Sequence, residues 1–232
     1  MEWLAVVTAA VAPGFALLAY FYLKDKYDSE PIHMVARVFL FGVLLVFPTM
    51  VVQRALIVGL GENPILFAFG ITAAIEEFLK WFIVYYAIYK HTVFDEPYDG
   101  IVYAVSVSLG FATLENVIYA MLNSFSFSML LFRALLPVSG HALFAVMMGY
   151  YMGKAKFGDP AQTKKLLAMS LLVPIICHGL FDYILLQMKS NWAWAIVPFM
   201  LYMWARGMSN VRRANSSSPF RLTGPEEEVK IP

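Results

Sequence analysis

The chain has 232 residues, of which 60% are hydrophobic and only 14% charged, and its mean hydropathy is +0.67. A soluble domain carries about 25% charged residues to cover its surface. The formal net charge is +1 and the Lys and Arg residues are dispersed, which excludes nucleic acid as the main partner. The single cysteine, Cys177, excludes an internal disulfide and a cysteine-rich zinc site. Composition therefore predicts an integral membrane protein.

Seven apolar runs are long enough to cross the bilayer core, for which a helix needs about 20 residues. In chain order they span 3–23, 38–58, 65–88, 100–122, 129–152, 166–188 and 191–208. Polar residues and turn residues separate them. The sequence thus predicts an all-α, polytopic bundle of about seven transmembrane helices, with eight as the alternative count, in one membrane-embedded domain at 1–208.

The positions of the Lys and Arg residues predict the orientation of this bundle. Most of them lie in alternate connections and in the C-terminal segment, whereas the opposite side has only Arg54 and Lys189. Because cytoplasmic loops carry an excess of Lys and Arg, the N-terminus is expected outside and the C-terminus in the cytoplasm. Residues 209–232 are polar and lack apolar periodicity, so we expect a disordered cytoplasmic tail.

Ionisable residues interrupt four consecutive predicted helices, where each costs about 2.5–3.5 kcal/mol on insertion into a bilayer. They are Glu76, Glu77, Lys80, Glu115, His141, His178 and Asp182. Counted along each helix at about 1.5 Å per residue, five of them lie roughly 9–18 Å from the outer end: Glu76, Glu115, His141, His178 and Asp182. Since the helices alternate in direction, their convergence on one layer predicts a single site.

Spacing within the helices predicts side-chain pairs. Glu76 and Lys80 are four residues apart and share a helix face, whereas Glu77, about 100° around the helix, is expected to point elsewhere. His178 and Asp182 are also four apart. An acid in that position can fix the tautomer of the imidazole or bind substrate beside it.

Such a set of residues is suited to activating water, which needs a general base, an oxyanion stabiliser and usually a metal or an acid pair. Four acids against Lys80 leave the site negatively charged, so either a divalent cation or a protonated carboxyl must compensate. Two alternatives remain at this point. The polar residues can be structural pairs that lock helices together, or they can relay protons in a proton-coupled transporter or line a lipid-binding membrane protein.

Five segments, in order, carry a resemblance to a known family: YLKDKYDSEP, EEFLKWF, FDEPYDGIVYAVSVSLGFATLENVIY, RALLPVSGHALFAVMMGYYMGKA, and VPIICHGLFDYILL followed by SNW. With these the chain resembles the PrsW family of bacterial intramembrane proteases, distant relatives of the prenyl-protein (CAAX) endopeptidase and bacteriocin-processing group. The resemblance implies a multi-pass peptidase of the bacterial plasma membrane. It also implies a first, site-1 cleavage in a single-pass anti-sigma factor of the RsiW type, which leads to release of an extracytoplasmic-function sigma factor under envelope stress.

The resemblance further implies roles for residues. The family's essential acid pair maps onto Glu76 and Glu77, and its late histidine onto His178. The family is classed with metallopeptidases, which implies a zinc ion, whereas in the wider superfamily a Glu activates water without metal. Against that wider pattern, Lys80 stands one residue earlier than an Arg and Glu115 replaces a His, so the metal-dependent and glutamate mechanisms both stay open. The candidate metal ligands are Glu115, His141 and His178.

Overall fold

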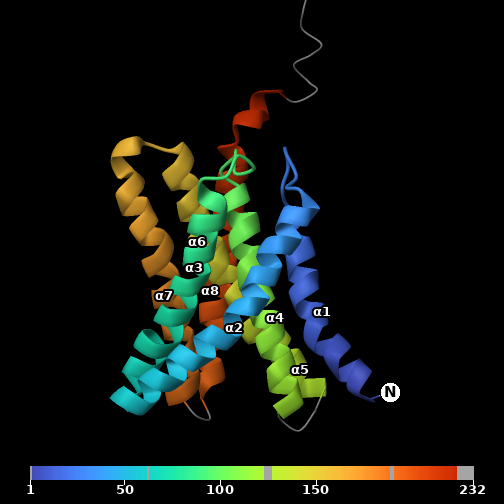
Figure 1. Ribbon diagram of the computed structural model, residues 1–232, viewed down its shortest axis with the longest axis vertical. Helices are drawn as coiled ribbons and strands as arrows, with labels where there is room; N and C mark the ends of the chain where they lie inside the picture. Colours follow the sequence, from blue (N-terminus) through green and yellow to red (C-terminus); the bar gives the residue numbers. More distant parts are fainter. Residues whose placement is uncertain (1, 62, 123–126, 189–190, 224–232) are drawn as a thin grey trace, which may run out of the picture.

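The computed structural model describes residues 2–61, 63–122, 127–188 and 191–223. Within these ranges the chain forms eight α-helices and no β-strand, so the predicted all-α class is confirmed (Figure 1). The bounds of the helices are α1 Glu2–Tyr22, α2 Ile32–Leu60, α3 Ala74–Ile83, α4 Asp99–Leu122, α5 Phe127–Arg133, α6 Ser139–Phe157, α7 Thr163–Gln187 and α8 Trp192–Ser216.

Short stretches of wider π-helix extend some of these helices. Two of them, η1 (Leu66–Ala73) and η2 (Val84–Tyr89), flank α3, and η3 (Ala134–Val138) joins α5 to α6. Two 3-10 turns, η4 (Pro160–Gln162) and η5 (Pro219–Thr223), precede α7 and follow α8. Each predicted membrane run therefore coincides with a continuous helical segment.

Four of these segments, within the described residues, are long and apolar enough to cross a membrane. They are Ile32–Leu60, Asp99–Leu122, Leu131–Phe157 and Pro160–Gln187. The apolar part of α1, Val6–Tyr22, is shorter. The segment around α3 carries three charged residues near its centre, and charge lowers the mean hydropathy of a helix. The structure thus supports a multi-pass helical protein, while the count of seven crossings stays a prediction.

Helix α4 lies at the centre of the bundle, with α1, α2 and α6 packed around it (Figure 1). In the most apolar stretch of this helix, 78% of the residues are buried. Glycines bring the neighbouring backbones into direct contact: a Cβ on Gly149 of α6 would lie 2.1 Å from the carbonyl oxygen of Gly100 on α4. On the other side, a Cβ on Gly110 would lie 2.0 Å from the carbonyl oxygen of Phe39 on α2. Small residues permit such close helix packing in membranes.

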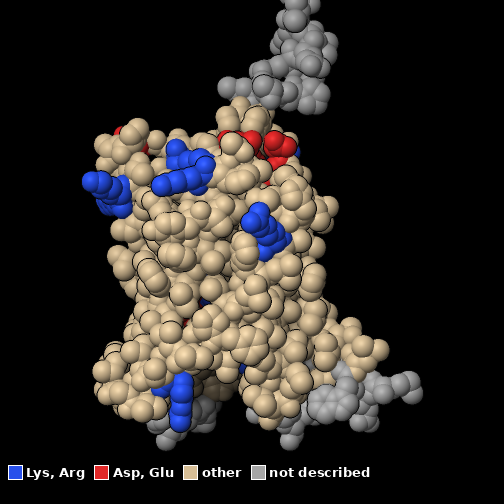
Figure 2. Space-filling model, viewed as in Figure 1, with Lys and Arg blue, Asp and Glu red and all other residues tan. Residues whose placement is uncertain are grey.

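The surface of the bundle is apolar over most of its length. Large side chains on α2 such as Leu40, Leu44 and Phe47 are more than half exposed. Figure 2 shows few charged side chains across the middle of the visible face and a concentration of them toward the end where the α1–α2 connection lies. An apolar band with charged residues toward its ends is typical of a protein surrounded by lipid.

The C-terminal helix extends further than the sequence suggested. We expected a disordered segment from residue 209, but α8 continues through Ser216, with Asn210 and Asn215 buried. The Nδ2 amide of Asn215 donates a hydrogen bond to the carbonyl oxygen of Lys24 at 3.2 Å. This tertiary contact stabilises a helix end whose composition is polar. After α8, Pro219–Thr223 form η5, and residues 224–232 of the expected tail lie outside the described residues.

The close packing of α4 against α6 gives a first prediction. Gly149→Leu should lower the unfolding free energy by about 3 kcal/mol or more, because the added side chain displaces the α4 backbone. Gly59→Ala on α2 is the matched control, since a Cβ there meets nothing within 4 Å. We expect this variant to be neutral or slightly stabilised. Thermal unfolding in detergent, followed by Trp fluorescence, measures both, and equal melting temperatures would contradict the backbone contact.

Candidate active site

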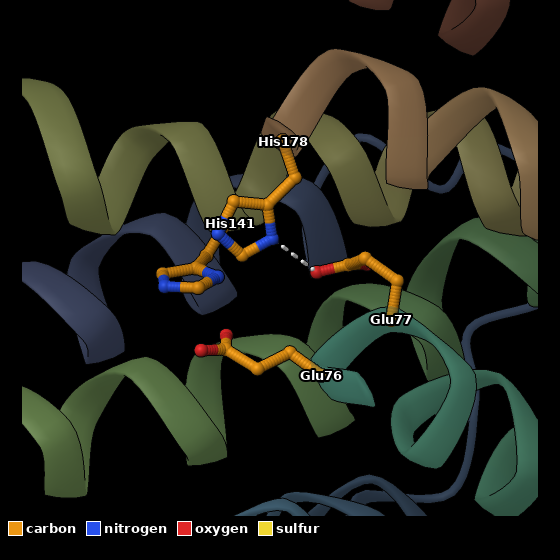
Figure 3. Close-up of side chains that lie close together, drawn as sticks. All are labelled: Glu76, Glu77, His141 and His178. Atoms are coloured by element: carbon orange, nitrogen blue, oxygen red, sulfur yellow. Dashed lines mark hydrogen bonds and ion pairs between the residues drawn. The ribbon is translucent and has the colours of Figure 1, made fainter. Parts of the chain in front are cut away.

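All seven sequence-predicted site residues lie in one connected cluster inside the bundle. Helix α3 contributes Glu76, Glu77 and Lys80, and the other four come from α4, α6 and α7. Figure 3 shows Glu76, Glu77, His141 and His178 converging from three helices on one small volume. The structure thus brings together in space the residues that the sequence placed at similar depths on separate helices.

The ammonium group of Lys80 is the centre of this cluster. Its Nζ donates hydrogen bonds to Glu77 Oε1 at 2.8 Å, to Glu76 Oε2 at 3.2 Å and to His141 Nδ1 at 3.1 Å. It also lies 4.4 Å from the centre of the Phe111 ring, a distance suited to a cation–π contact. The Lys80 side chain is fully buried, so these groups replace water around the charge.

One sequence expectation about α3 was wrong. Glu77 was expected to point away from the Lys80 face, yet it is the nearer of the two acids to Nζ. The reason is geometric: residues three apart on a helix are neighbours just as residues four apart are. Both acids therefore pair with the same ammonium group.

The hydrogen bonds assign the tautomer of His141. An ammonium group can only donate, so Nδ1 of His141 must accept from Lys80. The proton of the neutral ring then lies on Nε2, which donates to Glu115 Oε2 at 3.2 Å. The backbone carbonyl of His141 accepts a further hydrogen bond from the hydroxyl of Ser108, at 2.9 Å. Hydrogen bonds thus hold His141 at both ring nitrogens and at its backbone carbonyl.

His178 is oriented by Glu77 more than by Asp182. Its Nδ1 donates to Glu77 Oε1 at 2.9 Å, whereas Nε2 is 3.6 Å from Asp182 Oδ2, beyond hydrogen-bond length. The ring also stacks on Phe144, with centroids 5.0 Å apart and planes at 18°. Helix spacing suggested that Asp182 fixes the tautomer of His178. Asp182 is only a neighbour of the ring, and Glu77 from another helix fixes the tautomer instead.

The residues of the site differ in exposure: Glu77 and Lys80 form a closed floor, whereas Glu115 and Asp182 lie on an open side. Glu77 is fully buried, and its Oε2 has no hydrogen-bond partner. The side chain of Glu115 is 41% exposed, and that of Asp182 is 20% exposed. A cavity of about 220 Å³ between α2 and α4 is lined by Glu76, Glu115, Phe111, Gln53 and Arg133, among others. Of the seven site residues, Glu76 and Glu115 reach this cavity.

Gln53 is a site residue that sequence reasoning missed. Its Nε2 donates to Glu76 Oε1 at 3.2 Å, so Glu76 is held between an amide on α2 and the ammonium of Lys80. The signal in the sequence was an uncharged amide within the apolar run TMVVQRALIVG. A polar side chain in a membrane helix usually has a partner. Because an amide costs less to bury than a charge, it is a weaker indicator of a functional site.

Four residues could together hold a metal ion. Glu76, Glu77, His141 and His178 each offer one ligand atom, and these atoms lie within 4.8 Å of one another. Glu115, which the sequence suggested as a metal candidate, lies outside this group and bonds to the far nitrogen of His141. Imidazole and carboxylate ligands are a set that zinc accepts. Three of these four residues, Glu76, Glu77 and His141, also bond to Lys80, so a metal ion and the ammonium group compete for them.

Comparison with known proteins decides the family. Residues 30–205 match the model of the PrsW family of intramembrane metalloproteases. The chain belongs to the PrsW family. The matched region contains every residue of the cluster around Lys80, and the resemblance found from sequence segments is confirmed. No solved structure matches the chain.

Relatives named Protease PrsW match nearly the whole chain. One from Geobacillus kaustophilus is 51% identical over 211 residues, covering 90% of this chain and 92% of the relative. One from Bacillus subtilis is 48% identical, covering 91% and 96%. A more distant one from Clostridioides difficile is 33% identical, covering 84% and 83%. The protein is therefore a multi-pass membrane peptidase of a bacterium, and the peptidase interpretation replaces the transporter alternative.

The shared ammonium gives a second prediction. Lys80→Met removes the cation from two buried carboxylates and should destabilise the protein by about 3–5 kcal/mol. Adding Glu77→Gln to Lys80→Met should cost less than the sum of the single changes, by about 1 kcal/mol or more, because the two residues are in contact. Melting temperatures of the four proteins in detergent measure this coupling. Lys80→Met combined with Asp159→Asn, an exposed loop acid, is the control and should be additive.

Proposed function

We propose that this PrsW protein makes the first, site-1 cleavage in a membrane-anchored anti-sigma factor and so activates an extracytoplasmic-function sigma factor under envelope stress. The observation that carries the proposal is the buried Glu77–Lys80 pair that positions Glu76 at a cavity inside the bundle. The sequence resemblance supplies the substrate class. We take the partner to be a single-pass membrane protein and the orientation to be N-terminus outside, as the distribution of Lys and Arg favours.

Different roles for Glu76 and Glu77 follow from what each reaches. Glu76 lines the cavity and is held by Gln53 and Lys80, so a water molecule and a peptide bond can reach its carboxylate. Glu77 is fully buried and bonded to Lys80 and His178. We therefore assign the general base to Glu76 and a positioning role to Glu77, which fixes both the ammonium and the imidazole.

The proposed reaction is hydrolysis of a peptide bond by water. Glu76 takes a proton from water as the water oxygen bonds to the carbonyl carbon. Protonated His178 stabilises the negative charge on the carbonyl oxygen by donating from Nε2, because its Nδ1 already donates to Glu77. The proton on Glu76 then passes to the amide nitrogen, the carbonyl re-forms as the C–N bond breaks, and a carboxylic acid and an amine leave. Asp182 and Glu115, on the open side of the site, are placed to contact the substrate backbone.

The cavity also suggests how a substrate reaches the site. Val46, Met50 and Phe111 line it together with the acids, and Arg133 adds a positive charge. Arg133 is held there by a 2.7 Å hydrogen bond from its Nε to Asn116 Oδ1. Apolar walls suit a transmembrane segment of the substrate, and fixed polar groups suit the main chain of an unwound stretch within it.

A zinc ion is compatible with this assignment. His141, His178 and Glu77 form the two-histidine, one-glutamate ligand set of catalytic zinc sites, which leaves Glu76 free as the base. The unpartnered Oε2 of Glu77 is an available ligand atom. When bound, zinc would supply Lewis-acid polarisation of a water or carbonyl oxygen. Binding requires Lys80 to give up its hydrogen bond to His141.

The catalytic roles give a third prediction. In proteoliposomes containing a tagged single-pass anti-sigma factor, Glu76→Gln, Glu77→Gln and His178→Ala should each lower the cleavage rate by about 100-fold or more. Glu76→Gln should lower the melting temperature less than Glu77→Gln, because Glu76 reaches a cavity and its bond to Lys80 is longer, 3.2 Å against 2.8 Å. Asp28→Asn, in an exposed loop, is the control. Unchanged cleavage by Glu76→Gln or by His178→Ala would overturn the assignment.

The metal assignment gives a fourth prediction. Protein purified without chelator should contain about one zinc ion per chain. His141→Ala and His178→Ala should each weaken the affinity for zinc at least about tenfold and so lower the zinc content. Treatment with 1,10-phenanthroline should stop cleavage, and added zinc should restore it. Elemental analysis and the proteoliposome assay measure both effects. Full cleavage by metal-free protein would instead establish the glutamate mechanism with Lys80 as the only cation of the site.

A further inference from the structure

A second group of buried acids lies far from the Lys80 cluster, at the other end of α4. Asp25 belongs to the α1–α2 connection, Glu96 to the α3–α4 connection, and Asp99 begins α4. One carboxylate oxygen from each lies within 4.8 Å of the others. Asp99 and Glu115 are 16 residues apart on α4, so the two sites are separated by about 24 Å along the helix. Figure 2 shows acidic side chains at this end of the molecule.

Glu96 is buried without a hydrogen-bond donor or a cation beside it. It is fully buried, and neither of its carboxylate oxygens has a hydrogen-bond partner. Both carboxylate oxygens of Asp25 and Oδ1 of Asp99 are likewise buried without a donor. Within the described residues, no Lys, Arg or His forms an ion pair with any of the three; the five ion pairs that involve described residues all lie in the Lys80 cluster. A buried carboxylate without a donor or a cation is costly.

The surroundings hold these carboxylates in place. Oδ2 of Asp99 accepts hydrogen bonds from the backbone amides of Asp95 and Glu96, both at 2.7 Å, which fixes the Asp99 side chain and leaves Oδ1 free. The hydroxyl of Tyr98 donates to the carbonyl oxygen of Phe21 at 2.8 Å, which joins the two connections. The site is therefore built from two anchored loops and a helix start.

A fourth acid adds to the negative charge. Glu30 is buried beside this group and accepts a hydrogen bond from the hydroxyl of Tyr103. Such a cluster is neutralised either by bound protons or by a cation.

We propose that Asp25, Glu96 and Asp99 bind a hard divalent cation of the Mg²⁺, Ca²⁺ and Mn²⁺ class, which fastens the α1–α2 connection to the start of α4. The ligands are all carboxylate oxygens, which these ions prefer, and no imidazole or thiolate that would favour zinc is in the group. Five unpartnered buried oxygen atoms supply more than enough coordination sites for one ion. The site is independent of the peptidase chemistry proposed for the Lys80 cluster.

Mn²⁺ is the probe for this site, because its binding can be followed by electron paramagnetic resonance on the full chain in detergent. We expect one saturable Mn²⁺ in the wild type, displaced by Ca²⁺ or Mg²⁺. Glu96→Gln should weaken this binding at least about tenfold, and the adjacent, exposed Asp95→Asn should not. The cation should raise the melting temperature of the wild type and of Asp95→Asn, but not of Glu96→Gln.

Two further measurements separate this site from the candidate active site and from a folding defect. His178→Ala should retain the Mn²⁺, since its change lies in the other cluster. In the wild type, the pulsed electron paramagnetic resonance spectrum of bound Mn²⁺ should lack the nitrogen coupling that a histidine ligand produces. This measurement uses wild-type protein alone, so it does not depend on whether a variant folds. Equal Mn²⁺ affinity in the wild type and Glu96→Gln, nitrogen coupling, or no saturable binding would each overturn the proposal; the last outcome would leave protons as what neutralises the group.

Discussion

The arrangement of the helices that carry the candidate active site depends on one buried ammonium group. Lys80 has no access to water, so its charge must be balanced by protein groups, and these come from its own helix and from α6. Glu77 links this group to α7, because the Glu77 oxygen that accepts from Lys80 also accepts a hydrogen bond from His178. A change in the position of any of these helices would leave a charge unpaired at low dielectric, which is strongly unfavourable.

This constraint also explains how a membrane protein can hold a polar site in fixed geometry. The hydrogen bonds that Lys80 donates to His141 and His178 donates to Glu77 orient both imidazoles, and the rings of Phe111 and Phe144 pack beside them. Glu76, in contrast, reaches a cavity. In the proposed mechanism, Glu76 is therefore the carboxylate that meets water and substrate. Preorganisation of this kind lets a site act without rearranging its own dipoles.

The two acidic groups along α4 balance buried negative charge in different ways. Near Glu115 the acids are paired with a lysine and two histidines from the same chain. At Asp99 no basic side chain of the described residues pairs with the acids, and one carboxylate oxygen is satisfied only by backbone amides. The first group is chemically suited to reaction, because its charges are internal and aimed at a cavity. The second joins two loops to a helix start.

Much of the candidate site could be predicted from the sequence because membrane burial makes charge conspicuous. The seven residues from Glu76 to Asp182 were identifiable from type and depth alone, and the structure brings all seven together. Their pairing was not predictable. Helix spacing alone suggested Asp182 as the partner of His178, yet Glu77 on α3 is closer, since packing between helices sets that distance. The contact of Gln53 with Glu76 depends on the same packing.

The sequence by itself determined the all-α class, the membrane setting and the helical segments, because these follow from local composition and the need to satisfy backbone polar groups in lipid. Only the tertiary structure decided which acids are buried outside the apolar runs. Asp25 and Glu96 lie in polar connections, where a solvated position is the ordinary expectation, and they become buried through contacts between loops distant in sequence. The helical end of α8 has the same origin: its polar sequence favours no structure, and contact with the α1–α2 connection supplies it.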